Sequence, residues 1–204
     1  FTHYLQSLRV VDFLEKDGKG LNLTWEVRNG IVTHTTGAWA RTPEGCVVRR
    51  ADHIAFLNHD IEDAVTAGVL DPRQLPPEAV AVLGTTKSQR ITTMITDLIE
   101  HSQNGRINFS PEVDAAYAVL KDFMYSTVYV DKEAKREEKK VDKLVAELYE
   151  RLCEEPTLMP NFYLQTAYNE GVDRAVTDYI SGMSDEFATR LFEDLFVPQK
   201  WTVL

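Results

Sequence analysis

Apolar residues recur along this chain at intervals of three and four, the spacing that lets an amphipathic helix bury one face. The clearest example is the stretch 46–65, which is followed by the helix-breaking residues Gly68 and Pro72. Its apolar positions are Val47, Ala51, Ile54, Ala55, Ile61, Ala64 and Val65. We predict one long buried helix here, around which the rest of the chain is organised.

The same spacing predicts helices along the remainder of the chain, separated by Gly, Pro and Asn residues typical of turns. A first helix should end near residues 16–20, and a loop from Gly37 through Pro43 and Gly45 should lead into the stretch 46–65. Further helices are expected near 25–31, 77–83, 88–101, 111–129, 131–152, 162–168, 168–181 and 184–195. No segment alternates convincingly over more than four residues, so the predicted fold class is all-α, a multi-helix bundle.

Two of these helices begin with clear capping residues. Ser110 precedes a proline at the first helical position, and Ser184 precedes two acidic residues after a break at Gly182. The inward-facing positions expected in the last helix are Phe187, Leu191 and Leu195.

Composition and charge narrow the class of protein. The chain has 204 residues, 44% of them hydrophobic, with a net charge of -10 and a pI near 5.0. An acidic chain of this kind is unsuited to broad binding of duplex DNA or anionic membranes, which requires clustered Lys and Arg. No apolar run approaches the length of a transmembrane helix. The two cysteines, Cys46 and Cys153, form no CxxC motif, which favours a reducing cytoplasm.

The charges in the run 131–140 alternate in sign, which favours a solvated helix start over a nucleic-acid contact.

The chain opens at Phe1 without Met and is helix-patterned from its first residues. We expect it to be the C-terminal piece of a longer polypeptide, although a trimmed chain would look the same.

The middle of the stretch 46–65 carries ionisable residues, which are seldom buried without a partner. Asp52, Phe56 and Asp60 are four residues apart and share one helix face. On that face the carboxylates could bind a cation or accept a hydrogen bond from a hydroxyl group, and the aromatic side chain could stack on a ring. An exposed polar stripe or interhelix salt bridges would give the same pattern. The neighbouring His59-Asp60 pair could contribute to a metal site, or could be a chance dipeptide.

The sequence gives little support for nucleophilic catalysis or for a glycine-rich phosphate-binding loop. The chain has no nucleophile-elbow pattern and no glycine-rich phosphate loop, and neither cysteine has a histidine neighbour in sequence. Histidines and carboxylates on helices are the arrangement expected of a divalent-metal hydrolase.

Four separate stretches resemble the deoxyguanosinetriphosphate triphosphohydrolase-like branch of the HD-domain phosphohydrolases. They read FTHYLQSLRVV (1–11), GLNLTWEVRNGI (20–31), RADHIAFLNHDIEDA (50–64) and DYISGMSDEFA (178–188). The resemblance implies an all-helical HD-type bundle in which residues 1–70 border the active site and 71–204 form a C-terminal helical region. It also implies hydrolysis of a deoxynucleoside triphosphate to deoxynucleoside and triphosphate, with a divalent metal such as Mg²⁺ or Mn²⁺, usually in a homo-oligomer.

The resemblance assigns roles to four residues. Asp52 matches the last ligand of the family's metal set, and Asp60 matches the carboxylate that accepts the sugar 3'-hydroxyl. Phe56 stands where a tyrosine is usual, so its ring could pack on the sugar without the hydroxyl contact. His3 matches a catalytic histidine that faces the triphosphate, where an imidazolium can stabilise charge or donate a proton. Tyr4 and the leucine after it stand where Asn-Glu is common.

The other ligands of the family's metal set, a first histidine and an HD pair, have no match in these 204 residues. Because catalytic sites of this kind need three or more protein ligands, we expect the fragment alone to bind no metal tightly and to be inactive. Two alternatives remain: an HD phosphohydrolase of other phosphate esters, or a catalytically silent acidic module for regulation or oligomerisation.

Overall fold

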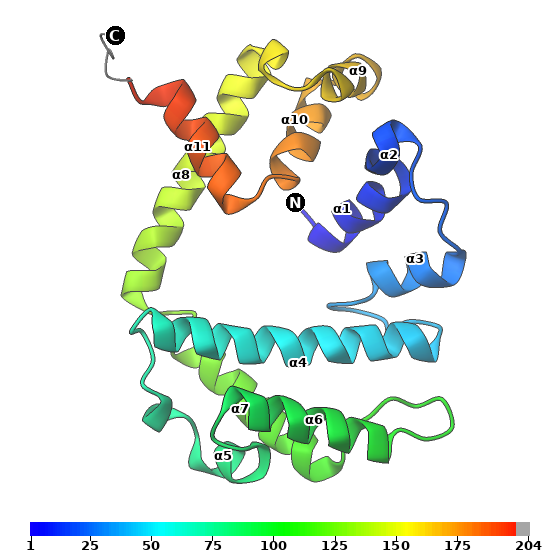
Figure 1. Ribbon diagram of the computed structural model, residues 1–204, viewed down its shortest axis with the longest axis vertical. Helices are drawn as coiled ribbons and strands as arrows, with labels where there is room; N and C mark the ends of the chain where they lie inside the picture. Colours follow the sequence, from blue (N-terminus) through cyan, green and yellow to red (C-terminus); the bar gives the residue numbers. More distant parts are fainter. Residues whose placement is uncertain (199–204) are drawn as a thin grey trace, which may run out of the picture. The chain divides into compact units, whose positions relative to one another are not determined.

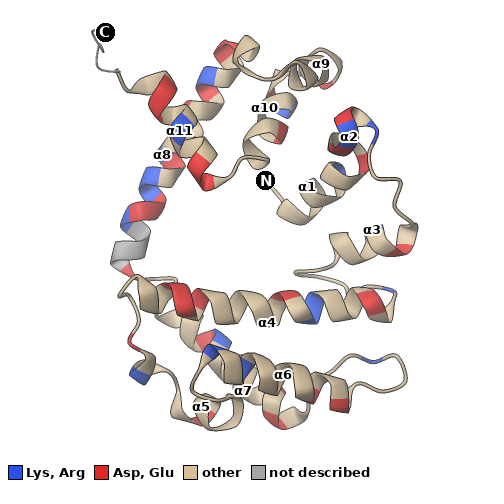
Figure 2. Cartoon of the chain, in the orientation of Figure 1, with Lys and Arg blue, Asp and Glu red and all other residues tan. Residues whose placement is uncertain are grey.

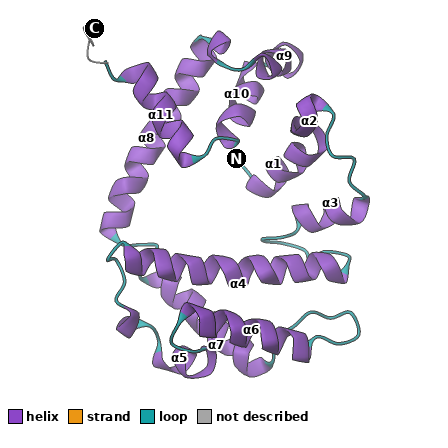
Figure 3. Cartoon of the chain, in the orientation of Figure 1, coloured by secondary structure: helices purple, strands orange, loops and turns teal. Residues whose placement is uncertain are grey.

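The computed structural model describes residues 1–198, except for the side chains of residues 132–135. Helices joined by loops make up this part of the chain, and its one β-type feature is the isolated bridge between Gln103 and Arg106 (Figures 1 and 3). The all-α prediction is confirmed. No helix in the described part is both long enough and apolar enough to cross a membrane.

The chain divides into two compact units. The first contains residues 1–12 and 21–135, and the second contains residues 13–20 and the chain from 136 onward. The helices of the first unit are α1 (His3–Arg9), α3 (Trp25–Val32), α4 (Pro43–Thr66), the short η2 (Pro72–Gln74), α5 (Pro77–Leu83), α6 (Lys87–His101) and α7 (Pro111–Ser126). The π-helix η1 (Val10–Leu14) and α8 (Lys132–Glu154) cross from one unit to the other.

Helix α4 begins earlier than the sequence predicted. The Thr42 hydroxyl accepts a hydrogen bond from the Gly45 backbone N–H, and Pro43 occupies the first helical turn, where its missing N–H costs nothing. Pro43 and Gly45 are therefore helical, not part of the preceding loop. A Cβ atom at Gly45 would lie 3.2 Å from the Gly30 Cα of α3, so the two glycines permit α3 and α4 to pack closely.

The core of the first unit lies on one side of α4. Ile54, Leu57 and Ile61 of α4 pack with side chains of α5, α6 and α7, which lie beside it in Figure 1. The most deeply buried of these partners are Ala79, Leu83, Met94, Leu120 and Met124. The prediction of one long buried helix does not hold for every apolar position of α4, because Val47 is 44% exposed and Ala51 and Ala55 are also exposed.

The second unit contains α2 (Glu15–Gly18), most of α8, η3 (Pro156–Leu158), α9 (Asn161–Glu170), α10 (Val172–Ser181) and α11 (Asp185–Phe196). Its core is formed by Leu152, Met159, Ala175 and Val176. Ser184 caps α11 as predicted, because its hydroxyl accepts from the Phe187 N–H. Phe187, predicted to face inward, lies edge-on to the Tyr179 ring of α10 with 6.4 Å between centroids, but it is 46% exposed, and α11 has no buried residue.

The charged run predicted to start a solvated helix lies partly outside the described side chains. From residue 136 onward, α8 shows alternating Lys/Arg and Asp/Glu residues (Figure 2). Lys140 pairs with Glu137 at 2.8 Å, and Lys143 pairs with Glu147 at 3.4 Å. These cations are paired within their own helix, which is the pattern of a solvated helix surface.

Candidate functional site

A polar pocket of about 650 Å³ lies in the first unit between α4, α7 and the loop that follows α3. Helix α4 contributes Arg49, Asp52, His53, Phe56 and Leu57, and α7 contributes Tyr117, Lys121, Met124 and Tyr125. The remaining lining residues are His3, Tyr129 and the loop residues 34–37. We refer to this space as the polar pocket.

Three of the four residues proposed from the sequence line this pocket together. Asp52 and Phe56 lie one turn apart on α4, and the Phe56 ring is 56% exposed. His3 comes from the start of α1, and its ring packs edge-on against His34 with 5.5 Å between centroids. The structure thus brings an imidazole, a carboxylate and an aromatic ring to one pocket. Their chemical roles stay predictions.

Asp60, the fourth residue, does not line the pocket directly. Its carboxylate accepts a hydrogen bond from the hydroxyl of Tyr129, which does line the pocket. Burial and this bond to Asp60 both raise the pKa of the Tyr129 hydroxyl, so the phenol remains the donor across the physiological range. Asp60 is therefore held at the edge of the pocket by a residue 69 positions away in sequence.

The α7 side of the pocket was not predicted from the sequence. Tyr117, Lys121 and Tyr125 recur every four residues on α7, and Tyr129 follows at the same interval just after the helix ends. The Tyr125 and Tyr129 rings pack edge-on with 4.9 Å between centroids. The repeated spacing of Tyr and Lys is visible in the sequence, but any amphipathic helix has the same spacing, so the pattern alone does not indicate a pocket.

Arg49 gives the pocket a fixed positive charge. The Arg49 Nη1 donates to the backbone carbonyls of Thr33, Gly37 and Ala38 at 3.1 to 3.3 Å, and the guanidinium lies 4.4 Å from the Trp39 ring centroid. Its Nε is buried and has no hydrogen-bond partner among the described residues. These bonds fix the orientation of a nearly buried cation at the pocket.

His53, unlike Arg49, is expected to contribute no charge to the pocket at pH 7. Burial lowers its pKa, and nearby Arg49 and Lys121 contribute in the same direction. The contact of its Nε2 with the Thr35 carbonyl, at 3.2 Å, opposes the shift. His53 is therefore expected to be neutral at pH 7. The permanent charges lining the polar pocket are two cations, Arg49 and Lys121, and one carboxylate, Asp52.

Comparison with known sequences shows what this chain is similar to. A phosphohydrolase-associated domain matches residues 107–194, which include α7 and its Tyr-Lys-Tyr face. A deoxyguanosinetriphosphate triphosphohydrolase-like protein of Caldanaerobacter subterraneus subsp. tengcongensis is 42% identical over 202 residues, 98% of this chain and 60% of the relative. This chain is a homologue of the deoxyguanosinetriphosphate triphosphohydrolase-like proteins.

Relatives in other bacteria carry the same description. Those of Clostridium perfringens (strain SM101 / Type A) and Clostridium tetani are 37% and 36% identical, each over 98% of this chain. The chain spans about three fifths of the length of these curated relatives, with 61% and 60% of their sequences matched.

The described residues do not by themselves form a complete site for the divalent metal that this homology implies. No group of three or more His, Cys, Asp or Glu side chains within the described part is arranged to hold an ion. Asp52 is the one carboxylate among the residues lining the polar pocket, so it can supply one ligand and no more. Donors from elsewhere would have to complete the site.

The alternative metal site at His59-Asp60 is contradicted by the geometry. Nδ1 of His59 lies 3.0 Å from Lys87 Nζ, whereas the Asp60 carboxylate is bonded to Tyr129. Lys87 also pairs with Glu62. Because adjacent helical residues point about 100° apart, the two side chains reach different neighbours and do not converge on one position.

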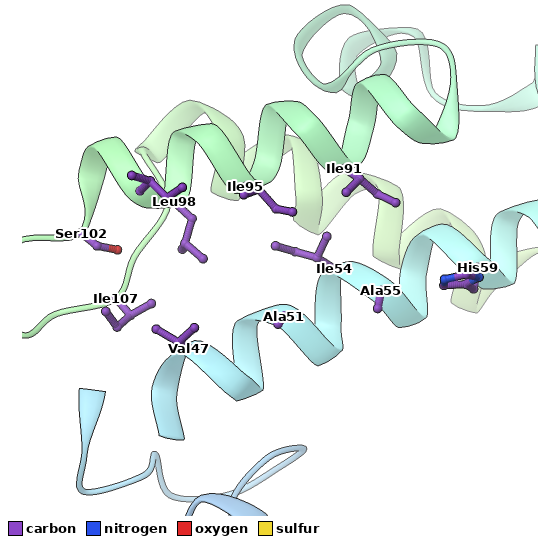
Figure 4. Close-up of a pocket in the computed structure, with 11 residues that line it drawn as sticks. Val47, Ala51, Ile54, Ala55, His59, Ile91, Ile95, Leu98, Ser102 and Ile107 are labelled. Carbon is purple, nitrogen blue, oxygen red and sulfur yellow. The ribbon is translucent and has the colours of Figure 1, made fainter. Parts of the chain in front are cut away.

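A second pocket, of about 420 Å³, lies between α4 and α6 and is almost wholly apolar. Figure 4 shows Val47, Ala51 and Ala55 of α4 on one side and Ile91 and Ile95 of α6 on the other, with side chains directed into the space between the helices. Its polar lining residues are His59 and Ser102. The residues that line this apolar pocket include no Lys or Arg, whereas the polar pocket is lined by Arg49 and Lys121.

Proposed function

We propose that this chain forms one side of the active site of a metal-dependent triphosphohydrolase that converts a deoxynucleoside triphosphate to deoxynucleoside and triphosphate. The observation that carries the proposal is that His3, Asp52 and Phe56, from two separate stretches of sequence, line one pocket. The bond between Tyr129 and Asp60 places the fourth residue at its edge. The homology to triphosphohydrolase-like proteins supports the same activity.

The residues of the pocket suit the parts of such a substrate. The exposed Phe56 ring offers an apolar face to a deoxyribose, and the Asp60 carboxylate can accept a hydrogen bond from a sugar hydroxyl. Arg49 and Lys121 provide positive charge for a triphosphate. His3, exposed on the first turn of α1, can donate a proton or a hydrogen bond to a phosphate oxygen as negative charge develops there.

Hydrolysis to deoxynucleoside and triphosphate breaks the bond between the sugar 5' oxygen and the α-phosphorus, with water supplying the new oxygen. Asp52 contributes a carboxylate at the pocket, available as one metal ligand. The other ligands, and therefore activity, belong to the longer protein. We propose that this protein acts as a homo-oligomer in the cytoplasm, as the family resemblance and the two free cysteines suggest.

The decisive experiment measures release of inorganic triphosphate from each of the four deoxynucleoside triphosphates by the full-length protein with Mg²⁺ or Mn²⁺. Asp52→Asn should keep the helix intact but lower turnover by at least about 100-fold, because a charged ligand is lost. Asp63→Asn is the matched control, since Asp63 is an exposed carboxylate of α4 outside the polar pocket. Equal rates for Asp52→Asn and the unmutated protein would refute the proposed function.

A further inference from the structure

A column of alternating aromatic and cationic side chains joins two residues that line the polar pocket. The Trp39 ring centroid lies 4.4 Å from Cζ of Arg49 and 5.0 Å from Cζ of Arg50. Cζ of Arg50 lies 4.9 Å from the Phe109 ring centroid, and the rings of Phe109 and Tyr117 are 6.0 Å apart. The two ends of the column, Arg49 and Tyr117, both line the polar pocket, whereas Trp39 does not.

Trp39 is the aromatic contact that the two neighbouring guanidinium groups share. Arg50 is tied to the start of α7, because it pairs with Asp114 at 3.7 Å and its Nε donates to the Ile107 carbonyl at 3.5 Å. Like charges repel, and the electron-rich face of an indole offsets that repulsion better than any other aromatic side chain. The Trp39 ring therefore connects a cation held near α7 with the cation at the pocket.

Arg49 in turn determines the path of the turn 33–38, in the loop between α3 and α4. Its Nη1 donates to the carbonyls of Thr33, Gly37 and Ala38, so both ends of the turn are bonded to one atom of α4. The residues between those ends, 34–37, form one wall of the polar pocket. Trp39 follows the turn directly, and its ring packs on the same guanidinium. The position of this wall therefore depends on Arg49 and Trp39 together.

Trp39 contributes little to the hydrophobic core. Its side chain is 44% exposed, and it is absent from the core cluster of the described part of the first unit. An indole that stays this exposed while it packs on two cations acts more through the orientation of those cations than through buried apolar area.

We propose that Trp39 is a positioning residue, which holds Arg49 and the turn 33–38 in the shape that receives the nucleotide; this inference rests on the proposed function. Trp39 acts through Arg49 and does not touch the ligand. Without the ring, the guanidinium and the turn lose a contact that fixes them, so the wall must be ordered when the nucleotide binds, which lowers affinity. The bond that breaks lies elsewhere in the pocket, so KM should change more than kcat.

The first test measures triphosphate release by the full-length protein. Trp39→Ala should raise KM for the deoxynucleotide about tenfold and leave kcat within about threefold. Trp39→Phe keeps a ring for the guanidinium and should hold KM within about threefold of the unmutated protein. Trp25→Ala is the matched control, because Trp25 is a 56% exposed tryptophan of α3 outside the pocket lining, and its KM should not change.

A double variant tests the route through Arg49. In an Arg49→Lys background the planar guanidinium is already lost, so adding Trp39→Ala should raise KM by less than about twofold. A further tenfold rise in that background would overturn the role of Arg49 as the intermediary.

The second readout needs no catalytic activity. Trypsin cleaves after Arg41, an exposed residue of the same loop, when that segment leaves its folded path. Trp39→Ala should speed this cleavage about fivefold relative to cleavage after Arg73, an exposed arginine of η2 that reports on the rest of the first unit. Trp39→Phe and Trp25→Ala should leave the ratio of the two cleavages unchanged.

Failure of this proposal can be told from failure of the proposed function. If the protein hydrolyses deoxynucleotides and Trp39→Ala has the same KM as Trp25→Ala, or the same cleavage ratio, Trp39 does not position the pocket wall, and the proposed function stands. If the unmutated full-length protein releases no triphosphate from any deoxynucleotide, the proposed function fails, and the effect of Trp39 on nucleotide affinity fails with it.

Discussion

Helix α4 borders two pockets of opposite character. On the α7 side, Asp52 and Phe56 meet an aromatic and cationic surface, and on the α6 side Val47, Ala51 and Ala55 meet isoleucines. Both sets recur every four residues, so both are faces of the same helix. Hydropathy alone assigns the apolar set to the core, yet these residues are exposed in the described chain.

The two sides of α4 are held to their neighbours by different polar contacts. On the α6 side, a hydrogen bond between two buried side chains, Arg90 of α6 and Asn58 of α4, joins the two helices. The α7 side is joined at its edge by the bond between Asp60 and Tyr129, which also lies at the candidate site. We therefore expect mutations on the α6 side to act on stability, and mutations on the α7 side to act on both stability and ligand binding.

The largest effect on stability is expected at Asn58. This side chain is fully buried, its Oδ1 accepts from Arg90 Nε at 2.9 Å, and its Nδ2 donates to the Ile54 carbonyl at 2.8 Å. Asn58→Ala leaves a buried guanidinium N–H unpaired, which should lower the free energy of unfolding by about 2–4 kcal/mol. Urea denaturation of the full-length protein measures this change.

Asn58→Asp is the informative partner variant, because it keeps an acceptor oxygen for Arg90 and adds an opposite charge. It should retain more stability than Asn58→Ala. Equal losses in the two variants would show that the bond to Arg90 does not support the α4–α6 side, and that the cost comes from the lost packing volume.

A smaller effect is expected on the other side of α4, at Tyr129. Tyr129→Phe removes the donor to the half-buried Asp60 carboxylate and should cost about 1–2 kcal/mol of unfolding free energy. The pKa of Tyr129 is raised in the folded protein, so its stabilising contribution is complete below the unfolded pKa of about 10 and declines as the pH rises above that value.

The pH dependence gives this prediction a second readout. The stability advantage of the unmutated protein over Tyr129→Phe should be constant from pH 7 to 9 and should shrink above pH 10. Tyr125→Phe is the matched control, since Tyr125 lines the same pocket but its hydroxyl makes no hydrogen bond to a carboxylate within the described part of the chain. A Tyr129→Phe variant as stable as Tyr125→Phe would mean that the bond to Asp60 contributes nothing measurable.

Helix positions could be predicted well from the sequence because capping and termination are local. Ser110 and Ser184 cap α7 and α11 as expected, and α5 ends at Leu83 immediately before Gly84. Burial was harder to predict, since it depends on which neighbours arrive from elsewhere in the chain. Val47 and Phe187 are apolar at helical spacing and yet remain exposed.

The candidate site was predicted on one side only. The spacing of Asp52, Phe56 and Asp60 within α4 was readable because a single helix fixes it. The opposing residues on α7 required the packing of two helices that are far apart in sequence. Tyr129 and Asp60, 69 residues apart, could not be paired from local patterns.

The smallest effect is expected at the apolar pocket itself, and it tests whether this surface is part of the core. The Ile99 side chain lines this pocket but is 73% exposed, so folding buries little of its apolar surface. Ile99→Ser should change the free energy of unfolding by less than about 0.5 kcal/mol, as surface substitutions usually do. Leu98→Ser is the matched comparison one residue away, because Leu98 is buried at 9% exposure and should lose about 2–4 kcal/mol. Urea denaturation of the two variants gives both numbers. A loss at Ile99 as large as that at Leu98 would show that the apolar pocket is closed in solution and belongs to the core, which would remove the contrast between the two sides of α4.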